Sequence, residues 1–301
     1  MRINKKIFSV GLILMMLMTS LVGCGRDNRP KIGMVVSTLN NPFFVNMKEG
    51  AQKEANKLGY DLVVLDSQND PAKERANVED LIQLGVVALL INPTDSDAVV
   101  KTVEVANQKN VPVITLDRQA NGGKIVSHIA SDNIKGGEMA AKFVEDKFKN
   151  EKGPINVVEI QGIPGASATR DRGQGFHNIM DKDSKFKFVS IQAADFDRQK
   201  GLQVMENILQ ANPKVQVVFA HNDEMALGAV KAIKASGSKA MVIGFDGNDD
   251  AKDSIENGEM KATIAQQPDL IGALGVELAN KIHNGESVKD KIAADLKVFT
   301  K

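Results

Sequence analysis

The sequence predicts an α/β fold made of two doubly wound parallel-sheet lobes joined by a hinge. After Lys31, short β-branched runs alternate with longer amphipathic segments, which is the order of parallel strands and helical crossovers. Several runs are apolar throughout, as in strands buried on both faces. The runs outnumber the roughly 5–6 strands of a usual sheet, so two smaller sheets are expected.

The expected strands follow one another at regular spacing along the chain. They are Ile32–Ser37, Leu62–Asp66, Ala88–Asn92, Val111–Leu116, Ile125–Ile129, Ile155–Ile160, Phe188–Gln192, Val215–Ala220, Met241–Phe245 and Ala262–Ala265. Between them lie helix signals: Asn41-Pro42 starts one helix, Lys57-Leu58-Gly59 ends it, and Asp70-Pro71 starts the next. The break between the two sheets is expected near Ser131-Asp132-Asn133, about halfway along.

The N-terminal segment has the pattern of an export signal. A basic head precedes an apolar stretch from Ile7 to Val22, which is shorter than the roughly 20 apolar residues that span a bilayer. Cys24 is the only cysteine, and it directly follows a Leu-x-Gly triplet, so the segment resembles a bacterial lipobox. The alternative is a free cysteine after a signal peptide, but its position favours cleavage before Cys24 and a lipid on its sulfur.

Composition limits the partners and the sources of stability. Lys+Arg 38 balances Asp+Glu 38, so there is no basic field for nucleic acid. With one cysteine no intramolecular disulfide can form, and stability must come from packing a chain that is 43% hydrophobic. Trp is absent and Tyr occurs once, whereas Phe occurs 12 times, so Phe is the aromatic residue for stacking on a ligand.

Polar residues follow almost every expected strand. In open α/β sheets, ligands bind beyond the carboxyl ends of the strands. The residues at these ends are Ser37-Thr38, Asp66-Ser67, Asn92-Pro93, Asp117-Arg118, Asp132-Asn133, Gln161-Gly162, Asp195-Phe196-Asp197, Asn222-Asp223, Asp246-Gly247 and Gln266. Taken singly, each is better explained as the cap of the following helix.

Two pairs are harder to explain by capping. Asp117-Arg118 places a carboxylate beside a guanidinium at a strand end, and vicinal hydroxyls of a sugar fit such a rigid fork. Phe43-Phe44 follows the first strand at a helix start. One of these rings is expected in the core, and the other flat over an apolar face of a ligand.

No motif for catalysis, metal or cofactor binding is complete. The stretch from Asp246 begins like a calcium loop, but its sixth position is Ala251 and its twelfth is Asn257. The glycine-rich turn 162–169 lacks the Gly-Lys-Ser/Thr ending of a phosphate loop, and no Gly-x-Ser-x-Gly elbow occurs. The four histidines have no metal-ligand spacing. Ligand capture without a cofactor is therefore favoured over an enzyme.

Taken together, eight segments resemble the periplasmic sugar-binding proteins of ABC importers, most closely the ribose-binding members. They are 36–44, 90–97, 113–118, 128–133, 194–198, 222–228, 244–247 and 263–266. The resemblance runs from Lys31 to the C-terminus. It implies the type I periplasmic binding protein fold, in which two lobes close over one monosaccharide, here D-ribose, and a membrane permease recognises the closed form.

The resemblance also implies boundaries and a ligand set. We expect a signal peptide at 1–23, a lipidated linker at 24–30, an N-terminal lobe at 31–131 plus 267–293, and a C-terminal lobe at 132–266 plus 294–301. The implied ligand residues are Asn41, Phe43, Phe44, Asp117, Arg118, Arg170, Phe196, Asn222, Asp246 and Gln266. Phe43 and Phe44 would flank one face of the sugar ring and Phe196 the other.

Several alternatives stay open from the sequence. The sugar could be another pentose, allose or a furanose signal, or the protein could be an extracellular sugar-modifying enzyme. Signalling to a chemoreceptor is a possible added role. The chain also resembles the effector domain of sugar-responsive repressors, but a leader stands where their DNA-binding helices would be. His221 and the Lys-rich stretch 181–188 depart from the family pattern. A monomer tethered to the membrane is expected.

Overall fold

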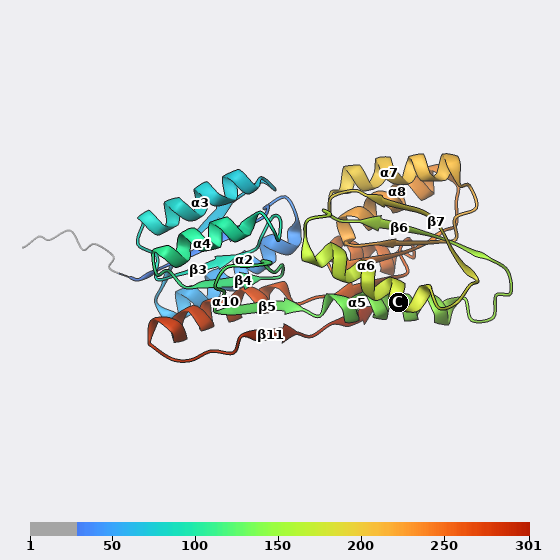
Figure 1. Ribbon diagram of the computed structural model, residues 1–301. Coiled ribbons are helices and arrows are strands. Elements are labelled where there is room, and N and C mark those ends of the chain that lie inside the picture. The colour runs from blue at the N-terminus through green and yellow to red at the C-terminus, as the bar shows by residue number, and fades with distance from the viewer. Residues whose placement is uncertain (1–28) are drawn as a thin grey trace, which may run out of the picture.

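The computed structural model describes residues 29–301, which form two α/β lobes lying side by side (Figure 1). The expected signal peptide, the lipidation site Cys24 and most of the linker lie outside the described residues. Each lobe contains a six-stranded sheet covered by helices on both faces, so the expected fold class is confirmed. Between residues 29 and 301, no helix has both the length and the apolar character needed to cross a membrane.

The first lobe is built on an all-parallel sheet. Its strands are β1 (Lys31–Val36), β2 (Asp61–Asp66), β3 (Ala88–Ile91), β4 (Val113–Leu116), β5 (Ser127–Ser131) and β11 (Lys291–Ala294), in the spatial order β11-β5-β4-β3-β1-β2. One face packs against α2 (Pro42–Leu58) and α10 (Pro268–His283). The other face packs against α3 (Pro71–Gln83) and α4 (Val99–Gln108).

The second lobe repeats this plan. Its strands are β6 (Ile155–Gln161), β7 (Phe186–Ala193), β8 (Val217–Ala220), β9 (Met241–Asp246), β10 (Ala262–Ala265) and β12 (Lys297–Phe299), in the order β12-β10-β9-β8-β6-β7. Only β12 runs antiparallel to its neighbour. Its helices are α5 (Asn133–Lys147) and α6 (Ser167–Met180) on one face, and α7 (Arg198–Ala211), α8 (Asp223–Ser236) and α9 (Asp249–Glu256) on the other.

The chain passes between the lobes at three places in the described residues. It crosses between β5 and α5, between β10 and α10, and between β11 and β12. β11 includes Ala294, which the sequence assigned to the second lobe, and β11 and β12 were not among the expected strands. All ten expected runs do form strands. The hinge expected between the lobes stays a prediction.

The two lobes also touch outside the crossings. The amide of Ser96 donates to the carbonyl of Gly165 at 3.0 Å, and the amide of Ser167 donates to Oγ of Ser96 at 3.2 Å. The amide of Gln119 donates to Oγ of Ser167 at 3.0 Å. These bonds join the loop before α4 and the segment after β4 to the start of α6, so the carboxyl ends of the two sheets face each other.

Candidate functional site

A small cavity lies between the lobes and contains about 220 Å³ of space not filled by protein atoms. Its lining residues are Asn41, Phe43, Phe44, Asp117, Arg118, Ala168, Arg172, Phe196, Asn222 and Asp246. The cavity thus brings together every predicted site residue except Arg170 and Gln266.

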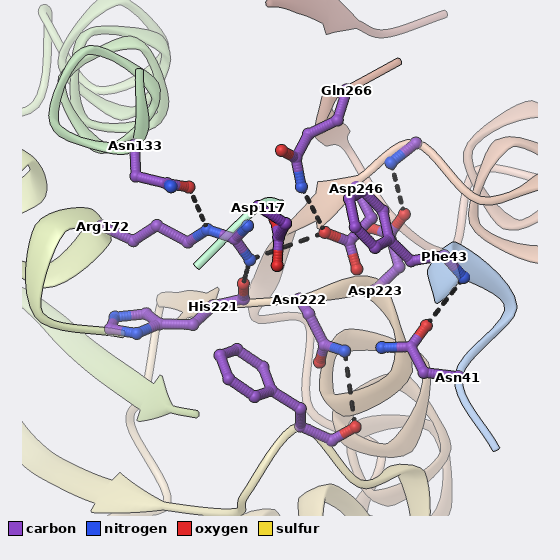
Figure 2. Close-up of polar contacts among 12 residues, drawn as sticks. Asn41, Phe43, Asp117, Asn133, Arg172, His221, Asn222, Asp223, Asp246 and Gln266 are labelled. Carbon is purple, nitrogen blue, oxygen red and sulfur yellow. Dashed lines mark hydrogen bonds and ion pairs between the residues drawn. The ribbon is translucent and has the colours of Figure 1, made fainter. Parts of the chain in front are cut away.

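Two of the lining residues combine a structural and a site position. Asn41 caps α2 because its Oδ1 accepts the amide hydrogen of Phe43 at 3.0 Å. Asn222 caps α8 in the same way, with its Oδ1 accepting from the amide of Met225 at 3.0 Å. Each cap uses the oxygen, and the NH₂ group of Asn222 donates a long hydrogen bond of 3.4 Å to the carbonyl of the lining residue Phe196 (Figure 2). Capping and ligand contact, which the sequence presented as alternatives, are therefore compatible at both positions.

Three lining residues have an unusual backbone conformation. Asp117 has φ of 60°, Phe196 has φ of 61°, and Asp246 has φ of 121°. Positive φ is uncommon for residues with a side chain, and such conformations persist where the surroundings enforce them, most often at functional sites. Each residue lies where a strand has just ended or ends, and the turned backbone carries its side chain to the cavity.

Asp117 and Arg118 form a buried acid–base pair on the first-lobe side. Asn92 donates to Oδ2 of Asp117 at 3.2 Å, and Arg118 donates through Nη1 to the carbonyl of Pro93 at 3.2 Å. Nε of Arg118 lies 3.8 Å from Oδ2 of Asp117. Among the described residues, neither Oδ1 of Asp117 nor Nε of Arg118 has a hydrogen-bond partner. One strong acceptor and one charged donor are thus free to bind a polar ligand.

Arg172 and Asp246 form a second pair on the second-lobe side. The guanidinium of Arg172 donates through Nε to Oδ1 of Asn133 at 2.8 Å and through Nη1 to the carbonyl of His221 at 2.6 Å (Figure 2). Nη1 also lies 3.5 Å from Oδ1 of Asp246, and the guanidinium lies 3.8 Å from the centre of the Phe245 ring. These contacts hold Arg172 rigidly at the cavity.

The two pairs balance their charges in a buried space. Burial raises the pKa of the Asp117 carboxyl, and the guanidinium groups of Arg118 and Arg172 oppose that rise. Burial likewise raises the pKa of Asp246 well above its usual value, with Arg172 again opposing. Two arginines, which stay charged under ordinary conditions, face two acids at once. The site as a whole therefore suits a neutral ligand with several hydroxyls better than a charged one.

Arg170, which the resemblance implied as a ligand residue, does not line the cavity. Its side chain is exposed, and Nη1 donates to the carbonyl of Gly165 at 3.0 Å. Arg172, two residues later, is 3% exposed and occupies the cavity instead. The helical period could have identified it, because Ala168, Arg172 and Phe176 share the buried face of α6 at intervals of four residues.

Gln266 lies behind the cavity. It is buried, and its Nε2 donates to Oδ1 of Asp246 at 2.9 Å, so it orients a lining carboxylate from the crossing between β10 and α10 (Figure 2). Its Oε1 has no hydrogen-bond partner among the described residues.

Phenylalanine rings from both lobes bound the cavity. Phe43 and Phe44 meet edge to face with centroids 5.2 Å apart, and both are buried in the first-lobe core. Phe196 comes from the second lobe. Its ring lies so close to Gly162 that a Cβ there would be 2.0 Å from the ring, which explains the glycine at the end of β6. The rings offer apolar walls beside the polar groups.

The described residues contain no cluster of three or more His, Cys, Asp or Glu side chains that could hold a metal ion. What the cavity does offer is an array of fixed hydrogen-bond donors and acceptors between aromatic walls. Such an array can recognise a small polyhydroxylated ligand by the directions of its hydroxyl groups.

Comparison with known proteins agrees with this geometry. The family model described as "Periplasmic binding protein domain" matches residues 32–287. The ribose import binding protein RbsB of Bacillus subtilis (strain 168) is 57% identical over 276 residues, which cover 92% of this chain and 89% of that protein. The ribose import binding protein RbsB of Escherichia coli (strain K12) is 58% identical over 271 residues, covering 90% of each.

A solved structure extends the likeness to three dimensions. The Caulobacter myo-inositol binding protein bound to myo-inositol has a TM-score of 0.85 and 32% identity, with 93% of this chain and 95% of that chain covered. The region matched by the family model, residues 32–287, includes every residue that lines the cavity. This chain therefore belongs to the periplasmic binding protein family.

Proposed function

We propose that this protein is the substrate-binding component of an ABC sugar importer, which captures D-ribose between its two lobes and delivers it to a membrane permease. The observation that carries the proposal is the pair of buried acid–base pairs, Asp117 with Arg118 and Arg172 with Asp246, which face one cavity from opposite lobes. The identity of 57–58% to proteins named for ribose import supports ribose over other sugars.

The chemistry of the cavity fits a small sugar. Carboxylates accept hydrogen bonds from vicinal hydroxyls, and guanidinium groups donate to hydroxyl and ring oxygens in one plane. Phe44 and Phe196 approach from different lobes, so a flat sugar ring between them would contact both. A ligand held by groups of both lobes stabilises the arrangement in which the lobes meet, and that arrangement is the signal for the permease.

A thermal-shift panel of neutral sugars tests the ligand. Ribose should raise the melting temperature with the logarithm of its concentration above the dissociation constant, while arabinose, xylose, allose and myo-inositol should act only at much higher concentrations. Calorimetry on the sugars that shift the melting temperature then gives affinities. If allose or another pentose gave a larger shift, that sugar would be assigned as the ligand in place of ribose. If none of the sugars shifted the melting temperature, the proposal would be overturned.

A sugar-modifying enzyme is the competing class of function. The cavity supplies no nucleophile bonded to a general base among its lining residues, and the family is one of binding proteins. Ribose recovered unchanged after long incubation with the protein would agree with capture. A new product would overturn it.

Anchoring and location complete the proposal. Membership of the periplasmic binding protein family implies that the protein is located outside the cytoplasm. The export pattern and the Leu-Val-Gly-Cys24 sequence support a lipid anchor on the cell membrane.

A further inference from the structure

A buried carboxylate lies outside the cavity but is bonded to the segment that holds Arg172. Glu159, on β6, is 0% exposed. Its Oε1 lies 2.8 Å from Nε2 of His221 and accepts from Nε2 of Gln161 at 3.0 Å, and its Oε2 lies 2.8 Å from Nε2 of His177. None of these four residues lines the cavity. A charge buried this deeply is costly unless it is paired and hydrogen-bonded, as it is here.

His221 links this carboxylate to the site. It stands directly before the lining residue Asn222, and its amide donates to the carbonyl of Ile160 at 2.9 Å. Its carbonyl accepts the 2.6 Å hydrogen bond from Arg172, while its ring points away from the lining side chains (Figure 2). One residue therefore holds Arg172 through its backbone and is itself held by Glu159 through its ring.

The charges of the cluster are settled by its geometry. Both ring nitrogens of His177 face carboxylates, Glu159 at 2.8 Å and Asp181 at 2.9 Å, so both must carry hydrogen. The hydrogen bond to Glu159 raises the pKa of His177 to about 9. Burial raises the pKa of Glu159, but the hydrogen bonds from His177 and His221 outweigh it and the net shift is downward. An imidazolium thus balances the buried carboxylate.

His221 stays neutral in this cluster. Burial lowers its pKa, the hydrogen bond that its ring donates to Glu159 opposes this, and the charges of Arg172 and His177 lower it further. Its Nδ1 has no hydrogen-bond partner among the described residues, so a second proton would find no acceptor. The ring is therefore a single N–H donor to Glu159.

A glycine in α6 allows the helix to lie close to Glu159 and His221. A Cβ at Gly173 would lie 3.0 Å from Oε1 of Glu159 and 3.4 Å from Cε1 of His221. Gly173 follows Arg172 directly, so α6 approaches the carboxylate closely at the turn that carries the site arginine. A Cβ at 173 would therefore be in tight contact with both members of this cluster.

We propose that Glu159 and His221 are positioning residues for ligand capture, because together they fix the carbonyl that holds the Arg172 guanidinium at the cavity. His177 supplies the balancing charge. This positioning role rests on the proposed function, because it is measured through the affinity of the protein for a sugar. The sugar used is the one that gives the largest shift in the thermal panel.

The first test compares substitutions of two histidines. His221→Ala removes the donor to Glu159 and should weaken sugar binding about tenfold or more. His221→Gln, whose amide can donate to Glu159, should recover most of that loss. The matched control is His128→Ala in the first lobe, where a mostly buried histidine of lowered pKa lies 2.9 Å from Oγ1 of Thr115. It should leave affinity unchanged even where it lowers the melting temperature.

The second test is the pH profile of affinity, measured for the parent and His221→Gln. The charged groups that act on His221 are Glu159 of β6 and Arg172 and His177 of α6. Protonation would place a cation near Arg172. Because burial lowers the pKa of His221, affinity of the parent should fall only at acid pH, below the usual titration range of histidine, while the Gln variant shows a flatter profile. This comparison remains decisive if His221→Ala does not fold.

The outcomes separate the two proposals. A parent that binds no sugar overturns the proposed function and this inference with it. A parent that binds sugar overturns only the positioning role in three cases: His221→Ala keeps full affinity, His221→Gln binds as weakly as His221→Ala, or both profiles have the same acid slope.

Discussion

The guanidinium of Arg118, from the first lobe, lies 5.1 Å from the centre of the Phe196 ring, from the second lobe. The same guanidinium lies 5.2 Å from the centre of the Phe44 ring on its own lobe. A buried cation thus has an aromatic face on each side of the cleft, a contact that attracts the lobes to each other when water is excluded. We therefore expect Arg118 to contribute to both ligand contact and closure.

Arg118→Ala should weaken ribose binding tenfold to hundredfold. The substitution leaves Asp117 buried without its cation, and losing a hydrogen bond to a charged group costs about 1.5–3 kcal/mol. Calorimetry measures the loss. The control is Lys57→Ala, on the exposed side of α2, which should bind like the parent. Parent-like binding by a folded Arg118→Ala would show that the cavity is not the sugar site.

Arg172→Ala and Arg170→Ala form a matched pair on one helix. Arg172→Ala should reduce affinity by at least tenfold, because it removes a rigid donor and leaves Asp246 without its buried counter-charge. Arg170→Ala removes only an exposed side chain that bonds Gly165, and its effect should stay within about threefold. The reverse order of effects would restore the residue first taken from the family resemblance.

Phe196→Ala should weaken closure as well as affinity. In the parent, saturating ribose should compact the protein, because only the closed arrangement makes contacts with both lobes. Small-angle scattering with and without ribose measures this change in shape, and the variant should compact less at equal saturation. Identical curves for the bound and free parent would remove closure as the signal for the permease.

Cys24→Ala should separate anchoring from binding. Without the sulfur there is no site for the lipid, so the protein should leave the membrane fraction or stay unprocessed, with ribose affinity unchanged. Fractionation with immunodetection and calorimetry on the purified protein measure the two properties. Normal cleavage with full membrane retention would contradict the lipobox.

His177 should make stability depend on alkaline pH. Its folded-state pKa of about 9 lies above the unfolded value of about 6.5, so its contribution is complete below pH 6.5 and is lost as pH rises toward 9. The melting temperature of the parent should fall over this window. His177→Gln should flatten the fall, whereas His283→Gln on the exposed end of α10 should not.

Much of the fold was predictable because parallel strands that are buried on both faces consist of consecutive apolar residues, which are recognisable in the sequence. The last two strands, β11 and β12, were not predicted, and the reason is physical. β11 and β12 are short and mostly exposed or half-exposed, so their sequences show neither alternation nor an apolar run. They form because β5 and β10 offer unpaired edges, which is a tertiary effect that local sequence does not report.

The site residues that lie at or just after the ends of strands were predictable from the sequence. Asp117, Asn222 and Asp246 follow or end strands, and they meet at the cavity as expected. Arg172 was missed because two arginines stand close together in one motif, and only the phase of α6 separates the buried one from the exposed one. The Glu159 cluster was missed because histidines far apart in sequence give no pairing signal.

The position of α10 and β11 near the end of the chain has a consequence for folding. Both belong to the first lobe, yet they follow the entire second lobe in the chain, and Ile271, Val276 and Leu278 of α10 are part of the first core. The first lobe therefore cannot close its core or complete its sheet until the chain has been made beyond Ala294. A truncation just before β11 would leave β5 and β10 each without the strand that covers its edge.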